Sequence, residues 1–175
     1  MKKLFYIFAL TFLFISCSDE SENIVDVSES EIAGVWDLTD FDLDVKTTYV
    51  FQGQSIVSET TAYGKDYDFS FTFNQNPNEI FNEGTFTIVT TTTTTAGETQ
   101  TIESPATVID GFNSGSWRIE NGKLITESTE NMTSEIIIES YSENKLVLKS
   151  PTNEELTEQG VSVKIKGNVF LTLER

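Results

Sequence analysis

The feature that most constrains the fold is a strict alternation of aromatic and polar residues. Tyr67, Phe69, Phe71 and Phe73 share one parity, and Asp, Ser and Thr stand between them. Successive side chains of a β-strand point to opposite faces, so this pattern predicts a strand with one aromatic and one polar face. A chain that contains such a strand has to bury the aromatic face in the core of a β-sheet.

The rest of the chain, from Ile32 onwards, repeats these β signals. Its clearest hairpin turn is Asn121-Gly122, between residues 117–120 and 123–127. Similar pairs of short apolar runs are 136–138 with 145–149, and 161–165 with 169–173. No segment has a convincing apolar stripe with helical period, although residues 151–156 could form one helical turn in a loop. The pattern predicts an all-β domain of eight or nine short strands, linked mostly by hairpins.

The first predicted strand changes parity along its length. Trp36 and Leu38 share one parity, whereas Phe41, Leu43 and Val45 share the other. A regular strand would not direct both sets into one core, so we predict a bulge or bend near residues 39–40. Trp36 itself is expected to be a structural plug at one end of the fold, because indole buries a large area and seeks one polar partner.

The longest connection covers residues 91–115 and begins within the threonine run 90–95. Threonine favours extended structure, whereas Gly97, Pro105 and Gly111 interrupt it. We expect strand ends that continue into a large, mobile loop. The threonines could also be an adhesive or glycosylated stretch, but a solvated edge strand fits the pattern better.

The N-terminus has the pattern of a secretory signal. Lys2 and Lys3 precede a short apolar run over residues 4–13, which is too short to span a bilayer. Cys17, the only cysteine, stands at the expected cleavage site. We therefore expect removal of residues 1–16, a disordered acidic tether over 17–31 and one domain over 32–175.

Composition excludes several functions. Removing Lys2 and Lys3 with the signal leaves 9 basic and 28 acidic residues, a net charge of −19. Such a surface repels phosphates, so nucleic acid is not an expected partner. The chain contains no histidine, which removes the commonest catalytic base and most metal sites, and no cofactor is expected.

Asp40, Asp42 and Asp44 suggest calcium, but Val45 and Phe51 stand where an EF-hand needs Gly and Glu. These acids are therefore interpreted as the solvated face of a strand, and no metal site is expected. We expect no enzymatic activity; a carboxylate-based hydrolase is a third and weaker alternative.

Two groups of residues carry a resemblance to a known family. Cys17 follows the apolar run as the cysteine of a lipobox does, and Gly34-Val35-Trp36 and Gly115-Ser116-Trp117 each open a predicted strand. Together with the order of the hairpins, they resemble the lipocalin-like lipoproteins of Bacteroidetes over residues 32–175. The resemblance implies a single antiparallel meander β-barrel of about eight strands. It also implies a basic residue packed against Trp36, for which Arg175 is the candidate by position and Arg118 the rival.

The same resemblance implies a location. Cys17 would carry the lipid that anchors the protein to the outer membrane, and no other membrane contact is expected. Ser18, Asp19 and Glu20 resemble the signal that exports such lipoproteins to the cell surface; an orientation towards the periplasm is the second choice.

The expected function depends on what fills the barrel. The residues expected to line its interior are Trp36, Tyr67, Phe69, Phe71, Phe73, Phe86 and Trp117. An eight-stranded barrel is just wide enough to fill with side chains or to hold one small ligand. Our prediction is a binding protein for a small apolar or amphipathic ligand, and the alternative is an interaction or scaffold module with a filled barrel. The sequence leaves the oligomeric state open.

Overall fold

The computed structural model describes residues 25–175 except 110, 113, 129–131 and 159. The predicted signal peptide, Cys17 and the export residues Ser18, Asp19 and Glu20 therefore lie outside the described residues. Within the part of the chain that is described, no helix is long and apolar enough to cross a membrane.

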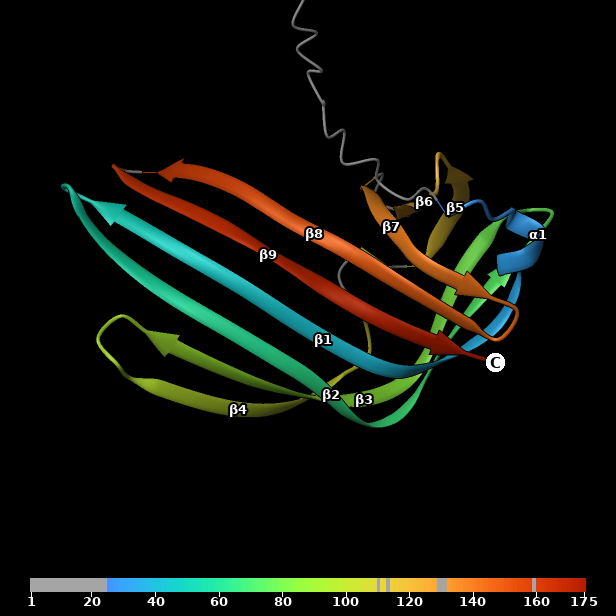
Figure 1. The fold of residues 1–175 in the computed structure, drawn as a ribbon, viewed down its shortest axis with the longest axis horizontal. Helices are drawn as coiled ribbons and strands as arrows, with labels where there is room; N and C mark the ends of the chain where they lie inside the picture. Colours follow the sequence, from blue (N-terminus) through green and yellow to red (C-terminus); the bar gives the residue numbers. More distant parts are fainter. Residues whose placement is uncertain (1–24, 110, 113, 129–131, 159) are drawn as a thin grey trace, which may run out of the picture.

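The described residues form one short helix and nine strands (Figure 1). Their bounds are α1 (Glu29–Ile32), β1 (Gly34–Phe51), β2 (Gln54–Asn74), β3 (Glu79–Thr94), β4 (Thr99–Ala106), β5 (Gly115–Glu120), β6 (Lys123–Ser128), β7 (Thr133–Ser142), β8 (Lys145–Glu158) and β9 (Val161–Glu174).

All nine strands belong to one antiparallel sheet that closes on itself. The strand order is β2-β1-β9-β8-β7-β6-β5-β3-β4, and β2 also pairs with β3. This additional pairing closes a ring of eight strands and leaves β4 attached to β3 outside the ring. The predicted all-β antiparallel meander of about eight strands is thus confirmed. β4 interrupts the meander, because β5 pairs with Glu79 and Ile80 at the start of β3.

The predicted irregularity in the first strand is present. Leu38 pairs with Leu173 and Asp40 pairs with Thr172, so Thr39 is an extra residue without a counterpart on β9. The extra residue lets side chains of both parities enter the core: Trp36 is 0% exposed and Phe41 is 4% exposed. The bulge therefore solves the parity conflict that the sequence contains.

Six strands form a part of the sheet beyond the ring: β1, β2, β3, β8 and β9 continue out of it, and β4 pairs with β3 alongside them. We call this part the extension: residues 43–62 of β1 and β2, 88–104 of β3 and β4, and 150–169 of β8 and β9. Figure 1 shows β8, β9, β1 and β2 running side by side through it, far from the short strands β5 and β6. The helical turn predicted at residues 151–156 is wrong, because these residues pair with β9 throughout and so satisfy their backbone in a ladder.

The long connection is more ordered than predicted. Most of the threonine run belongs to β3, and residues 99–106 return along it as β4. The loop that follows turns into the barrel, where Ile109 and Phe112 are 5% and 1% exposed. Burial of these two side chains explains why this segment is held in place instead of forming one large loop.

Packed structure also begins earlier than residue 32. Val27 is 6% exposed within the core, and α1 follows at once. The hydroxyl and the N–H of Ser28 both donate to the carboxylate of Glu31, and these bonds lower the pKa of Glu31. The segment from Val27 to Ile32 is therefore part of the domain and not of a tether.

Candidate functional site

The residues predicted to line the barrel do meet in its interior. Trp36, Phe69, Phe71, Phe73, Phe86 and Trp117 are all less than 5% exposed, and Tyr67 is partly buried. Their rings contact one another in series: the ring centroids lie 5.2 Å apart for Phe69 and Phe71, 5.4 Å for Phe69 and Phe86, and 5.2 Å for Phe73 and Trp117. At this level the barrel is filled by its own side chains.

A residue that the sequence reasoning missed completes this filling. Phe112, from the loop after β4, lies 5.6 Å from the ring of Phe71. The loop is held by the hydroxyl of Thr126, which donates to the carbonyl of Gly111 at 2.7 Å. The spacing of Ile109 and Phe112 in an otherwise polar loop was the only sequence signal for this role.

The closed end of the barrel is built around Trp36. Its indole N–H donates to the carbonyl of Ile32 at 2.7 Å, and the guanidinium carbon of Arg175 lies 4.1 Å from the centre of a ring of the indole. Arg175 also donates to the carbonyls of Ala33, Glu31 and Glu143, at 3.0, 3.0 and 2.6 Å. Arg175 thus joins the last strand to the end of α1, where helix carbonyls need partners.

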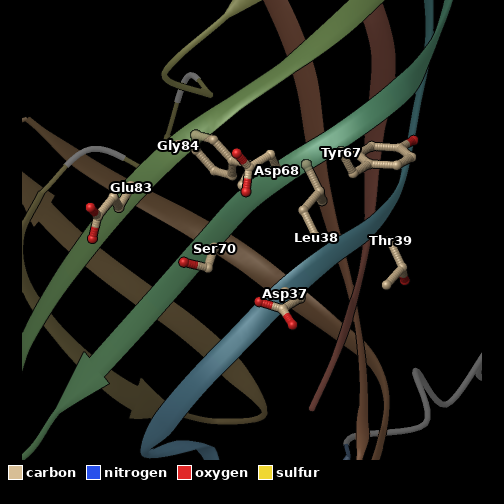
Figure 2. A pocket seen from close by; sticks show the side chains of 9 residues that line it. Asp37, Leu38, Thr39, Tyr67, Asp68, Ser70, Glu83 and Gly84 are labelled. Atoms are coloured by element: carbon tan, nitrogen blue, oxygen red, sulfur yellow. The ribbon is translucent and has the colours of Figure 1, made fainter.

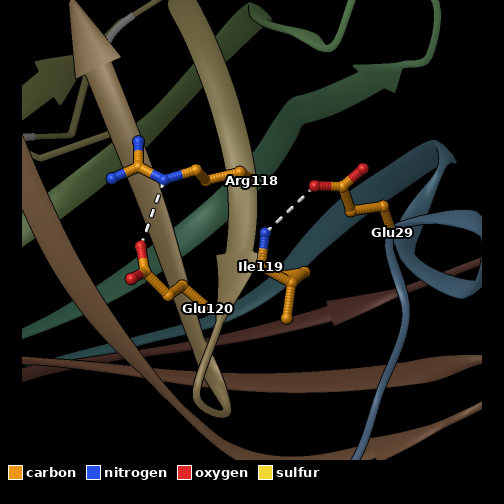
Figure 3. Close-up of polar contacts among 4 residues, drawn as sticks. All are labelled: Glu29, Arg118, Ile119 and Glu120. Atoms are coloured by element: carbon orange, nitrogen blue, oxygen red, sulfur yellow. Dashed lines mark hydrogen bonds and ion pairs between the residues drawn. The ribbon is translucent and has the colours of Figure 1, made fainter.

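Arg118, the rival candidate, has a different position. Its side chain pairs with Glu120 at 3.2 Å on the exposed side of β5 (Figure 3). The neighbouring backbone is tied to α1, because the N–H of Ile119 donates to the carboxylate of Glu29 at 3.4 Å. The same carboxylate accepts from Asn78 at 2.7 Å. Glu29 therefore fixes the helix across the barrel end, and Arg118 takes no part.

A hollow of about 630 Å³ lies where β1 and β2 separate. Its lining comes from three neighbouring strands (Figure 2): Asp37, Leu38 and Thr39 of β1, Tyr67, Asp68, Phe69 and Ser70 of β2, and Glu83 and Gly84 of β3. The pairing of β1 with β2 stops after Asp37 and resumes at Asp42, so the hollow is a consequence of the bulged register.

Tyr67 provides a hydrogen bond across the gap where β1 and β2 are not paired. Its hydroxyl oxygen accepts a hydrogen bond from the N–H of Phe41 at 3.0 Å. Burial raises the pKa of the Tyr67 hydroxyl against the lowering effect of this N–H, and the charges of Asp40 and Asp42 raise it further. The side chain lies over Gly64, where a Cβ would collide with the phenol ring. Tyr67 is thus a structural bridge and not a free acid.

The carboxylates of the hollow do not resemble a catalytic pair. Asp37, Asp68 and Glu83 are all exposed to solvent, whereas a catalytic carboxylic acid usually sits in an apolar, buried setting. Among the described residues, no three His, Cys, Asp or Glu side chains cluster in a way that could hold a metal ion.

A second hollow, of about 360 Å³, lies at the opposite end of the barrel from Trp36. It is lined by Gly111, Thr126, Ser128, Met132, Thr133, Ser134 and Glu154. Hydroxyl groups and one carboxylate dominate this lining. The open end of the barrel therefore offers polar groups, in contrast to the aromatic interior below it.

The inner face of the extension is an exposed apolar surface. We define this face by Leu43, Val45, Thr47, Tyr49 and Phe51 of β1, which continue the core-facing side of that strand, together with the residues paired with them on the neighbouring strands. Five large apolar side chains, from four strands, stand on it more than 40% exposed: Tyr49, Phe51, Ile56, Ile102 and Leu156. Such a group on one face indicates a contact surface.

Charge is distributed unequally between the two faces of the extension. On the inner face, Glu154 is the one charged residue whose side chain the structure describes. The outer face carries Asp44, Lys46, Glu59, Glu103, Glu155, Lys164 and Lys166, and Asp42 and Lys149 stand on the same side just outside the extension. Asp42 and Asp44 are exposed, as the strand interpretation of the Asp40–Asp44 series requires. A sheet solvated equally on both faces would have no reason to keep charge off one of them.

No family model, curated protein or solved structure matches this chain.

Proposed function

We propose that this protein is a non-catalytic interaction module of the bacterial cell envelope, and that a partner docks on the inner face of the extension. The observation that carries the proposal is the exposed apolar face with almost no charge, next to a barrel that is already filled by its own aromatic rings. A filled interior leaves little room for a ligand, whereas a sheet face with few charges loses little when water is removed from it.

The proposed location depends on Cys17 as the lipid attachment site. The change Cys17→Ser should move the protein from the membrane fraction to the soluble fraction, because several acyl chains on one residue supply its hold on the bilayer. Fractionation of cells followed by immunoblotting measures this. Unchanged membrane association of the variant would refute the anchor.

The proposed orientation, with the domain on the cell surface, depends on Ser18, Asp19 and Glu20. Changing Asp19, Glu20 and Glu22 to alanine should retain the protein inside the envelope. Protease added to intact cells would then spare the triple variant and cleave the parent. Equal cleavage of both would show that these residues are not the export signal. It would also contradict the periplasmic orientation, which is the second choice.

Docking on the inner face is tested by site-specific photocrosslinking. A photoreactive phenylalanine analogue at Ile56 should capture a protein on intact cells, and the same analogue at Tyr63 should not. Both side chains are more than half exposed, but they stand on the inner and outer faces of β2 respectively. Capture from both positions, or from neither, would refute docking on this face.

A second candidate function, binding a small amphipathic ligand, is favoured by the hollow at the open end. Ser134 and Glu154 would hydrogen-bond the polar end of the ligand, and the apolar part would lie on the neighbouring inner face. Saturable binding of a fluorescent fatty alcohol that is lost in Glu154→Leu would support it. Binding that persists in that variant would place the fatty alcohol elsewhere.

A further inference from the structure

We propose that the partner on the inner face is a second copy of this chain, packed face to face as a two-fold dimer. This inference rests on the proposed function and names its partner. It needs the inner face to be large enough, to fit itself, and to tolerate the charge of a second copy.

The inner face has the area of a stable interface. Opposite Leu43 to Val50, the strands β1, β2, β9 and β8 each contribute eight residues, β3 contributes five and β4 contributes four. At about 3.3 Å per residue and about 4.8 Å between strands, the face covers about 650 Å² for each copy, within the range of roughly 600–1,000 Å² that each partner contributes to a standard protein interface. A dimer through this face therefore needs no contact from the barrel.

The distribution of side-chain sizes makes the face complementary to itself. Towards the hairpin tips, one row across the sheet holds Leu156, Val163, Tyr49 and Ile56. Two rows nearer the barrel have smaller side chains over the central strands: one holds Thr152, Gly167, Val45, Thr60 and Thr92, and the next holds Glu154, Ile165, Thr47, Ser58 and Thr94. Glu154 stands at the end of its row, on β8, which is the edge strand of the extension.

A two-fold axis between these rows places the large row of one copy over the small rows of the other. Gly167 has no side chain because its backbone approaches β1 so closely that a Cβ would overlap the carbonyl oxygen of Asp44. Two sheets that pack in this way interdigitate their inner side chains at about 10 Å separation. The same surface serves both copies, as an isologous interface requires.

The charge of the protein opposes the dimer mainly at a distance; Glu154 is on the inner face, but it stands on the edge strand β8, where its carboxylate can stay in contact with water. The chain carries a formal net charge of −17, but the described charges of the extension stand on the outer faces, apart from Glu154. Such separated, exposed charges are screened by salt. Added salt should therefore strengthen the dimer, whereas it would weaken the binding of a basic protein partner.

The test combines the photocrosslink at Ile56 with the mass of its product. A second copy gives a product of twice the mass of the chain, and mass spectrometry of its peptides identifies this protein alone. In this background, Tyr49→Lys, in the same row on the central strand β1, should reduce the crosslink about a hundredfold or more, because it would bury an unpaired ammonium. Phe170→Lys, on the outer face of β9, is the matched control and should leave the crosslink unchanged.

The outcomes separate the two proposals. A product that contains a different protein refutes the second copy and leaves the interaction module standing. Absence of any product refutes both. A product of doubled mass that survives Tyr49→Lys, or that weakens as salt is raised, refutes face-to-face packing. Circular dichroism of both lysine variants should match that of the parent, since both positions are solvent-accessible.

Discussion

Replacing Trp36 by alanine should destabilise the domain more than any other single change at the closed end of the barrel. The indole is 0% exposed, donates to the carbonyl of Ile32 at 2.7 Å and lies 6.5 Å from the ring of Tyr141. Truncation removes this area from the core and leaves a cavity that the rigid strands around it would not fill. Changes of this kind cost about 3–5 kcal/mol of unfolding free energy.

Two further variants separate the parts of this effect. Trp36→Phe keeps most of the apolar area and loses the hydrogen bond to Ile32, so it should cost about 1–3 kcal/mol. Arg175→Ala loses the contact between guanidinium and indole, for which about 0.5–2 kcal/mol is typical. It also loses three hydrogen bonds to backbone carbonyls, but the residue is exposed and water can replace them. Its cost should therefore be well below that of Trp36→Ala.

Urea unfolding followed by far-ultraviolet circular dichroism measures these differences, since the signal of the sheet does not depend on either tryptophan. A double-mutant cycle of Trp36→Ala and Arg175→Ala should give a coupling energy of about 0.5–2 kcal/mol. A loss of less than about 1 kcal/mol in Trp36→Ala would contradict the buried plug. Additive effects in the cycle would show that Arg175 acts only through its bonds to α1.

Three other perturbations test the strand irregularities. Tyr67→Phe should cost about 1–2 kcal/mol of unfolding free energy by leaving the N–H of Phe41 without its partner. Because burial raises the pKa of Tyr67 above 10.0, the parent should also lose stability as the pH rises above that value. Urea unfolding at high pH should show a smaller loss of stability for the variant than for the parent. Gly84→Ala should lower the melting temperature, since Gly84 has a φ of +100° and a Cβ there would overlap the carbonyl of Asp68, whereas an unchanged melting temperature would refute this close approach. Deleting Thr39 should abolish cooperative unfolding by turning one set of apolar side chains outwards, whereas Thr39→Ala should change stability by less than about 0.5 kcal/mol.

The side-chain pattern determined the elements and their buried faces. The alternation over residues 67–73 identified the aromatic face of β2, and the change of parity between Leu38 and Phe41 located a bulge within one residue of Thr39. Both follow from the period of a strand, which is a local property that a short stretch of sequence carries in full. The partner of Trp36 did not follow from this period: the family resemblance implied a basic residue there and left Arg175 and Arg118 open, and the structure places Arg175 against the indole.

Tertiary structure decided which polar stretches became strands. Residues 151–156 show little apolar pattern, yet they form part of β8 because β9 offers their backbone a complete ladder. Segment 107–114 falls in the predicted mobile loop, but its Ile109 and Phe112 enter the barrel because the core above Phe71 still has room for them. Such outcomes depend on groups distant in the chain, which no local pattern contains.

The candidate interaction surface depends partly on the sequence pattern and partly on the tertiary structure. The sequence alone determined that the strands would have apolar and charged sides, since alternation fixes the side of every residue once a register is known. It did not determine that six strands form a part of the sheet beyond the ring, so that Tyr49, Ile56 and Leu156 stand together on a face that the barrel does not cover. Only the pairing of distant strands decides that, because the length of a sheet is set by the backbone partners each strand finds and not by its own side chains.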